Sequence, residues 1–144
     1  MGQEIIAKAA KIVEENAAKD GKYQGGISTV SLIDEAGFPT ASVISPSKFD
    51  GINWITFGTN INYNNVKRIR SNNRAAVSFS TAEYCVNLVG EMEIITSSDI
   101  KREMWYDGLA HHFTDADDLN YCVLKFSTKR YKLFIDGEEV AGTL

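Results

Sequence analysis

Short runs of β-branched and aromatic residues, separated by tight turns, fill most of the chain and restrict how it can fold. Residues 27–33 and 40–45 are strand-like runs, and residues 34–39 between them are rich in turn formers, which predicts a hairpin. Asp50-Gly51, among the strongest hairpin signals, precedes a third, aromatic-rich run at residues 52–59. This succession predicts an antiparallel sheet rather than a parallel α/β sheet.

Helical spacing interrupts the strand-like runs at two places. Residues 3–19 place apolar side chains at helical intervals opposite a Glu- and Lys-rich face, and Gly21 fits a helix stop. A second, short helix is predicted at about residues 62–72. It follows an Asn-rich corner at residues 60–65, and Asn is a residue that caps helices.

The second half of the chain continues the pattern with two more strands, at residues 75–80 and 84–95. Gly90 interrupts the longer of them and predicts a bulge or bend. Thr96-Ser97-Ser98-Asp99 has the spacing of a capping box, which predicts the start of a helix continuing through residues 100–113.

The C-terminal third predicts a closing hairpin of residues 121–127 and 131–135, followed by an Asp136-Gly137 turn into a short tail. The count is six or seven strands, one N-terminal helix and two short inserted helices, with no linker that would divide residues 1–144. The sequence therefore predicts one mainly β domain of the α+β class, a small closed antiparallel barrel with helices at its ends.

Composition excludes several classes of function. The net charge of −4 argues against nucleic acid as the main partner. No apolar run approaches the roughly 18 residues of a membrane span, and the charged N-terminus lacks the apolar core of a signal peptide. We expect a cytoplasmic protein that does not enter a membrane. Cys85 and Cys122 have no His or Cys partner at metal-binding spacing, so we expect free, buried thiols and no metal.

One window of the chain is positively charged. Residues 51–82 contain no Asp or Glu but contain Lys67, Arg68, Arg70 and Arg74. A strand ending in Thr59-Asn60, a helix start with unpaired N–H groups and cations one turn later are the parts of a phosphate site. The alternative reading of the same cations is a solvated helix face.

Side-chain catalytic motifs are absent. The sequence has no GxSxG, HExxH, P-loop or GxGxxG pattern. Its two histidines, His111 and His112, are adjacent and have no clear Ser or Cys partner, so we interpret them as residues at the surface or at a helix end.

Three segments in order, ASVISPSKFDGINWITFGTN, NNVKRIRSNNRAAVSFS and YCVNLVGEMEII, resemble the pyridoxamine 5′-phosphate oxidase-like family of FMN-binding split barrels, general-stress-protein branch. The resemblance covers about residues 25–135. It implies a six-stranded Greek-key split barrel that forms a homodimer, with FMN in clefts between the subunits.

The family's cofactor contacts can be carried over by position. They imply FMN-binding roles along the second strand, at the end of the third strand, at the next helix, on the partner-facing strand and in the inserted helix, at Ser42, Val43, Ile44, Phe57, Gly58, Thr59, Asn60, Asn64, Asn65, Cys85 and Trp105. Trp105 has a second reading as a core residue. Relatives commonly carry cations where this chain has Ser42, Asn64 and Asn65, and Lys67 and Lys48 are the candidates to compensate.

The resemblance implies an FMN-dependent oxidoreductase in which the flavin carries the redox chemistry, with an unknown small-molecule substrate. Oxidation of pyridoxamine phosphate itself is not expected, because the chain ends in the acidic and apolar DGEEVAGTL instead of a basic segment. Two alternatives stay open. One is a non-catalytic flavin- or haem-binding stress-response module. The weaker one is a nucleic-acid-binding barrel that uses the basic helix with Trp54, Phe57 and Tyr63.

Overall fold

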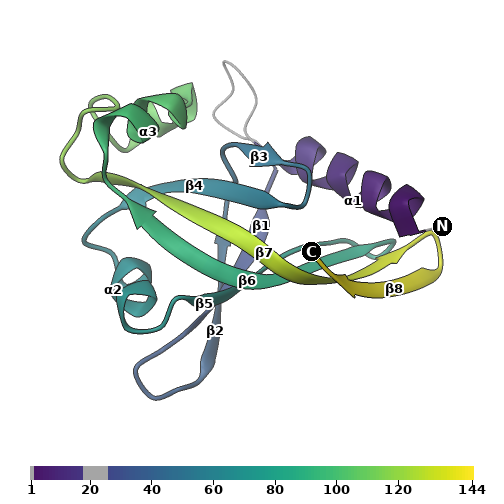
Figure 1. Cartoon of the computed structure of the whole chain (residues 1–144). Helices are drawn as coiled ribbons and strands as arrows, with labels where there is room; N and C mark the ends of the chain where they lie inside the picture. The colour runs from purple at the N-terminus through teal and green to yellow at the C-terminus, as the bar shows by residue number, and fades with distance from the viewer. Residues whose placement is uncertain (1, 18–25) are drawn as a thin grey trace.

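A computed structural model describes residues 2–17 and 26–144 and shows a curled antiparallel sheet flanked by short helices (Figure 1). The strands are β1 (Ser28–Ile33), β2 (Pro39–Ile44), β3 (Phe49–Asp50), β4 (Trp54–Asn60), β5 (Arg74–Ser80), β6 (Cys85–Ile95), β7 (Tyr121–Ile135) and β8 (Glu138–Thr143). The helices are α1 (Gly2–Asn16), α2 (Asn64–Ser71), α3 (Ser98–Glu103) and the 3-10 helix η1 (Asp107–His111).

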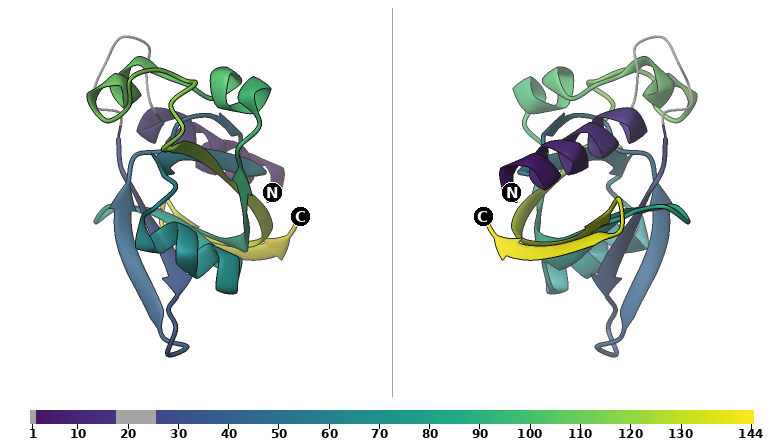
Figure 2. Two further views of the ribbon diagram at one scale, coloured as in Figure 1. Left: turned by 90° about the vertical axis from the view of Figure 1, so that its left-hand side faces the viewer. Right: turned by 90° about the vertical axis from the view of Figure 1, so that its right-hand side faces the viewer.

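The sheet has the strand order β2-β1-β5-β6-β7-β4-β3, and β8 pairs with the free part of β7. Every pairing is antiparallel. The long strands β6 and β7 bend so that the sheet wraps around an interior, as Figure 2 shows. Its two end strands, β2 and β3, do not pair with each other, so the barrel is split rather than closed. The α+β split-barrel class is confirmed, with eight strands in the described residues rather than six.

The core fills the inside of the curled sheet and is covered at one side by α1. Ile5, Ala9, Ile12 and Val13 recur at helical spacing and are buried in the same cluster as the inward side chains of the strands. Burying a side chain of this kind contributes roughly 1.5–3 kcal/mol. The predicted N-terminal helix is confirmed up to Asn16, and its expected stop at Gly21 lies outside the described residues.

Gly90 forms the bulge that its place in the sequence predicts. The register between β6 and β7 shifts between Val89 and Gly90, since Val89 faces Arg130 whereas Gly90 faces Thr128. A Cβ atom at Gly90 would collide with the backbone carbonyl oxygen of Ser127, so the close approach of the two strands requires glycine.

The predicted closing hairpin is wrong. Residues 121–135 form one continuous strand, β7, and the hairpin lies further on, at Asp136-Gly137, where β7 turns into β8. Both turn residues have positive φ, 54° and 77°, which Asp and Gly tolerate. The polar residues 127–130 look like a turn in the sequence, but they are the solvent-facing part of the strand at the bulge.

The predicted helix at residues 100–113 is also wrong as one element, since it is divided into α3 and η1 by a break at Trp105-Tyr106. The capping box does not form, because the N-cap of α3 is Ser97 and makes no side-chain hydrogen bond to the helix. The N-cap of α2 is Tyr63 rather than an Asn. The Asn-rich corner acts one turn earlier, where the Asn60 side chain accepts a hydrogen bond from the Asn62 amide at 2.9 Å.

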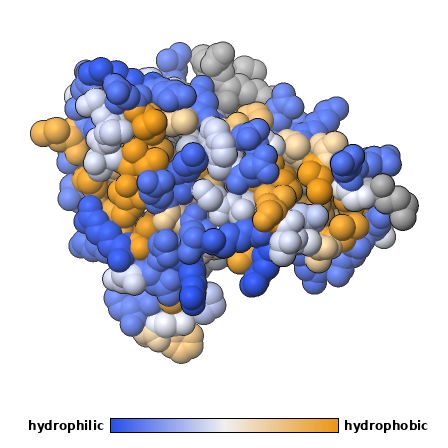
Figure 3. Space-filling view, in the orientation of Figure 1, coloured by the Kyte–Doolittle hydropathy of each residue, from blue (hydrophilic) through white to orange (hydrophobic). Residues whose placement is uncertain are grey.

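The surface is mostly hydrophilic on the face in Figure 3, with apolar patches over parts of the sheet and at the tip of the β1–β2 hairpin. Phe38, at that tip, is 68% exposed. None of the helices in the described part of the chain combines the length and the apolar character that crossing a bilayer requires.

Candidate functional site

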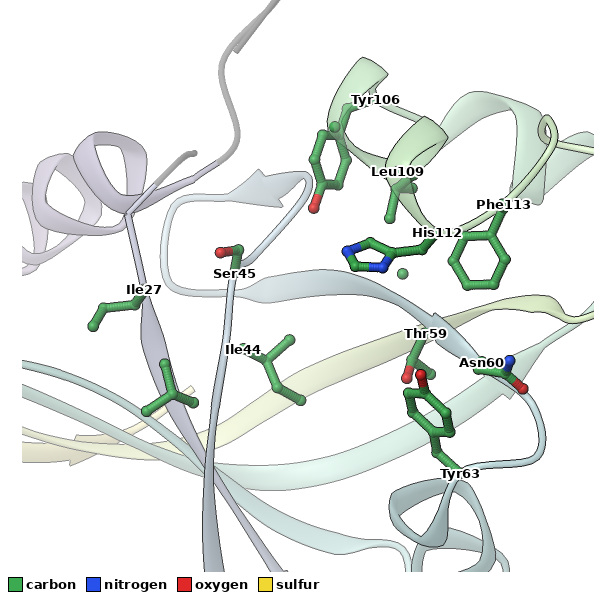
Figure 4. A pocket seen from close by; sticks show the side chains of 13 residues that line it. Ile27, Ile44, Ser45, Thr59, Asn60, Tyr63, Tyr106, Leu109, His112 and Phe113 are labelled. Atoms are coloured by element: carbon green, nitrogen blue, oxygen red, sulfur yellow. The ribbon is translucent and has the colours of Figure 1, made fainter. Parts of the chain in front are cut away.

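A cleft of about 580 Å³ opens between the end of β2, the end of β4, the start of α2 and the segment around η1 (Figure 4). Its volume falls within the roughly 300–1,000 Å³ typical of small-molecule and cofactor sites. The residues that line it are Ile27, Val43, Ile44, Ser45, Gly58, Thr59, Asn60, Tyr63, Tyr106, Gly108, Leu109, His112 and Phe113.

The floor of the cleft is the end of β4. Gly58, Thr59 and Asn60 pair with the start of β7, which fixes their backbone in the sheet. The Asn60 side chain then turns the chain toward α2, and this turn brings Tyr63 to the edge of the cleft. Helix α2 begins directly after Tyr63, so its first N–H groups, which have no partner within the helix, lie next to the cleft wall.

The roof of the cleft is the α3–η1 segment, which buried polar contacts hold to the barrel. The Tyr121 hydroxyl donates a hydrogen bond to the Lys101 carbonyl at 2.9 Å, and the Lys101 ammonium donates to the Asp118 carbonyl at 2.9 Å. The Ser47 hydroxyl donates to the Met104 carbonyl at 2.7 Å. Burial raises the pKa of Tyr121, so its hydroxyl stays a donor throughout the physiological range.

Leu109 of η1 packs directly onto the floor. A Cβ atom at Gly58 would lie 2.8 Å from the Leu109 side chain, so the absence of a side chain at this position lets the roof approach the sheet. Trp105, between α3 and η1, does not line the cleft and packs edge-on to Tyr121 with ring centroids 5.3 Å apart.

The cleft carries no fixed charge. None of its lining residues is Lys, Arg, Asp or Glu, and its ionisable side chains are Tyr63, Tyr106 and His112. Figure 4 shows the His112 imidazole and the Tyr106 hydroxyl extending from the roof into the cleft, with the Tyr63 hydroxyl beside Thr59. The arrangement suits a ligand with a flat apolar body and a few hydrogen-bonding groups.

Five of the residues to which the sequence assigns a binding role line the cleft, namely Val43, Ile44, Gly58, Thr59 and Asn60. The others lie elsewhere in the fold: Ser42, half-buried in β2; Phe57, fully buried in the core; Asn64, Asn65 and Lys67, in α2; Cys85, half-buried at the start of β6; and Trp105, packed behind the roof. The core reading of Trp105 therefore fits its position.

Eight lining residues were missed: Ile27, Ser45, Tyr63, Tyr106, Gly108, Leu109, His112 and Phe113. Most of them belong to the segment YDGLAHHF, residues 106–113, whose aromatic and apolar content is typical of a ligand-binding segment. His112 is exposed at the end of η1, as the sequence indicates, and it also faces the cleft.

The two cysteines are free thiols. Cys122 is fully buried behind the floor, and this burial raises the pKa of its thiol to about 11. Cys85 is half-buried. Within the described ranges 2–17 and 26–144, no group of three His, Cys, Asp or Glu residues is arranged to hold a metal ion.

No family model and no curated protein sequence matches the chain. Solved structures do match. A protein from Clostridium acetobutylicum related to general stress protein 26, of the pyridoxinephosphate oxidase family, superposes with a TM-score of 0.85 at 21% identity, over 100% of this chain and 97% of that chain. The chain has the general stress protein 26 fold.

Two further structures extend the comparison. General stress protein 26 from Bacillus anthracis gives a TM-score of 0.79 at 15% identity, over 98% of this chain and 99% of that one. A haem-binding protein from Mycobacterium smegmatis gives 0.74 at 16% identity, over 96% of this chain and 57% of that one. At these identities the likeness is one of fold.

Proposed function

We propose that the cleft binds FMN and that the protein is an FMN-dependent oxidoreductase. The observation that carries the proposal is the uncharged cleft of about 580 Å³ at the ends of β2 and β4, where five of the residues implied by the family resemblance come together. A bound flavin supplies the electron transfer, which fits a chain without a side-chain catalytic motif.

The residues present fit the two ends of FMN to different degrees. Ile44, Leu109 and Phe113 offer apolar contact to an isoalloxazine ring, and Thr59 and Asn60 offer hydrogen bonds. The phosphate has no Lys or Arg among the lining residues. The start of α2 is the best available seat for it, because helix N-termini attract anions.

The chain's own groups would orient the ligand and hold protons near it. The Thr59 and Tyr63 hydroxyls stand at one side of the cleft, and the His112 imidazole at the other. In this proposal His112 is the candidate proton donor or acceptor for a substrate, because its imidazole extends into the cleft.

We include a homodimer and a cytoplasmic location in the proposal. Ile27, Val43 and Tyr63 line the open side of the cleft and are 60%, 64% and 60% exposed, and such an apolar rim is typical of a surface covered by a partner. A second copy would complete the cleft. Free cysteines favour a reducing compartment.

Sedimentation of the purified protein tests the dimer. Wild type is expected at twice the mass of one chain. Val43→Lys, which puts a charge on the rim without touching the core, is expected to sediment as a monomer, whereas Glu35→Lys on the hairpin loop is the control. A monomeric wild type would refute the dimer.

Absorption spectroscopy tests the cofactor. The purified protein, mixed with FMN and freed of excess, is expected to retain one flavin per chain. Ser45→Trp, which fills the cleft, is expected to weaken FMN binding at least tenfold. Lys132→Gln, an exposed residue of β7 outside the cleft and away from α2, is the control. Equal binding by wild type and Ser45→Trp would show that the site is elsewhere.

A second candidate occupant is haem, which His112 specifically favours. The cleft combines apolar and aromatic walls with a single imidazole, the side chain that most often binds haem iron at its axial position. Titration with hemin tests this reading. A Soret band that disappears in His112→Ala would support haem, and FMN retention without hemin binding would exclude it.

Anaerobic mixing with NADH or NADPH separates an oxidoreductase from a non-catalytic module. Bleaching of the bound flavin supports the enzyme. Flavin that stays oxidised with both donors would instead support a flavin-binding module.

A further inference from the structure

The bulge at Gly90 gathers cations from two strands around a second pocket, of about 380 Å³. We call it the basic pocket, and it is lined by Arg74, Val89, Gly90, Glu91, Lys129 and Arg130. It shares no lining residue with the cleft.

The bulge explains why two consecutive cations face the same pocket. In a regular strand, successive side chains point to opposite faces, so Lys129 and Arg130 would separate. The register shift between Val89 and Gly90 places Lys129 as the extra residue of β7, and both side chains are exposed along the pocket. A bulge re-aims side chains in this way.

Arg74 enters the pocket from the neighbouring strand. Its amide donates a hydrogen bond to the Asn72 side chain at 3.1 Å, which fixes the turn from α2 into β5. Strand pairing then sets Arg74 opposite Glu91 of β6. Arg74 belongs to the acid-free window at residues 51–82. The other cations of that window, Lys67, Arg68 and Arg70, line neither the cleft nor the basic pocket.

The charges of the basic pocket do not cancel. Glu91 is its single carboxylate and already pairs with Lys129, at 3.2 Å between Oε1 and Nζ. The guanidinium groups of Arg74 and Arg130 form no ion pair and no hydrogen bond within the described ranges 2–17 and 26–144. The pocket thus carries an excess of two positive charges in a chain of net charge −4.

We propose that the basic pocket binds the phosphate group of a small phosphate monoester. Two guanidinium groups offer the paired N–H donors that match phosphate oxygens. The volume exceeds what a phosphate ion needs, which leaves room for a short organic body.

NMR titration of the full chain with inorganic phosphate, glycerol 3-phosphate and glycerol tests the proposal, with sodium chloride added to keep ionic strength constant. Both phosphates are expected to shift the Val89 and Gly90 amides saturably, and glycerol alone is not. The double variant Arg74→Gln/Arg130→Gln is expected to weaken both phosphates at least tenfold. Arg102→Gln, an exposed arginine outside the pocket, is the control and stays within twofold of wild type.

Three results would overturn the proposal. They are shifts that do not saturate, affinity in the double variant equal to that of wild type, and exclusion of glycerol 3-phosphate by a pocket that binds inorganic phosphate. Because glycerol 3-phosphate carries no flavin ring, failure of this experiment leaves the FMN proposal for the cleft standing. Likewise, absence of FMN binding in the cleft would leave the phosphate proposal for the basic pocket standing.

Discussion

The cleft and the basic pocket differ in the kind of interaction that each can offer. The cleft is larger, about 580 against 380 Å³, and its walls carry no Lys, Arg, Asp or Glu. The basic pocket is lined almost entirely by charged side chains around one glycine. The larger, apolar cavity and the cluster of positive charge thus lie at two different places on this barrel. A positive window in the sequence does not indicate where the concave, apolar site lies.

A substitution at the Gly90 bulge is expected to have the largest effect, because it disturbs the basic pocket and leaves the cleft in place. Gly90→Ala would drive a methyl group into the Ser127 carbonyl, which is held by the sheet and cannot move aside. We expect a loss of about 3 kcal/mol in the free energy of unfolding, with loss of phosphate binding at the basic pocket. Urea denaturation measures the loss. Gly2→Ala, where a Cβ has open space, is the control, and an equal effect of both would contradict the steric account.

Deprotonation of the buried Cys122 thiol is expected to give the next largest effect on stability. Burial raises the pKa of Cys122 to about 11 from an ordinary 9.0. The unfolded chain therefore loses the thiol proton first, and the stabilisation present below pH 9 is lost as pH rises toward 11. The expected loss is about 2–3 kcal/mol. Urea midpoints between pH 8 and 10.5 should fall more steeply for wild type than for Cys122→Ala, and parallel curves would refute the assignment.

The roof of the cleft can be loosened more gently. Tyr121→Phe removes the hydroxyl that donates to the Lys101 carbonyl and leaves this buried acceptor unpaired. We expect about 1–2 kcal/mol of destabilisation and weaker ligand binding in the cleft, with the basic pocket unchanged. Thermal melting and flavin titration measure the two effects. Tyr84→Phe is the control, and identical losses in both variants would disprove a specific role.

The smallest expected effect is the contribution of the FMN phosphate to binding in the cleft. Because no cation lines the cleft, FMN is expected to bind only about tenfold more tightly than riboflavin, the gain that a helix N-terminus can supply. Salt should change the affinity of the cleft little, whereas it should weaken phosphate binding at the basic pocket. Fluorescence titrations at two salt concentrations measure both ratios. A thousandfold preference for FMN would mean that a cation reaches the cleft.

The sequence predicts most strands because their patterns are local. The β1–β2 hairpin, the bulge at Gly90 and the turn at Asp136-Gly137 each depend on residue types within a few positions. Strand β8 was missed, since Glu138–Thr143 contains two acids and a glycine and forms a strand only because the exposed edge of β7 pairs with it. The predicted hairpin within residues 121–135 is wrong for a related reason. The polar residues 127–130 indicate a turn in the sequence, but they are the solvent-exposed part of one continuous strand.

The site is predicted in part, and the limit is again physical. Val43, Ile44, Gly58, Thr59 and Asn60 are carried over by position from the family resemblance, and they line the cleft. The roof, formed by α3 and η1, cannot be placed from the sequence, since a segment inserted between two strands can fold over either end of a barrel. Its side chains reach the cleft only through buried contacts made far away in the sequence, such as the hydrogen bond from Tyr121 to Lys101.

Strand β7 pairs with β4, β6 and β8, and it follows β4 and β6 in the sequence. Its pairing with β4 joins residues more than sixty positions apart, as between Asn60 and Tyr121. During synthesis on the ribosome, β4 and β6 therefore lack this pairing partner, and one edge of each stays unpaired until residues 121–135 have emerged. Pairings of such long range are slow to form. The barrel becomes complete only after β7 has been synthesised, and a nascent chain that stops before β7 exposes unpaired strand edges of the kind that call for chaperones.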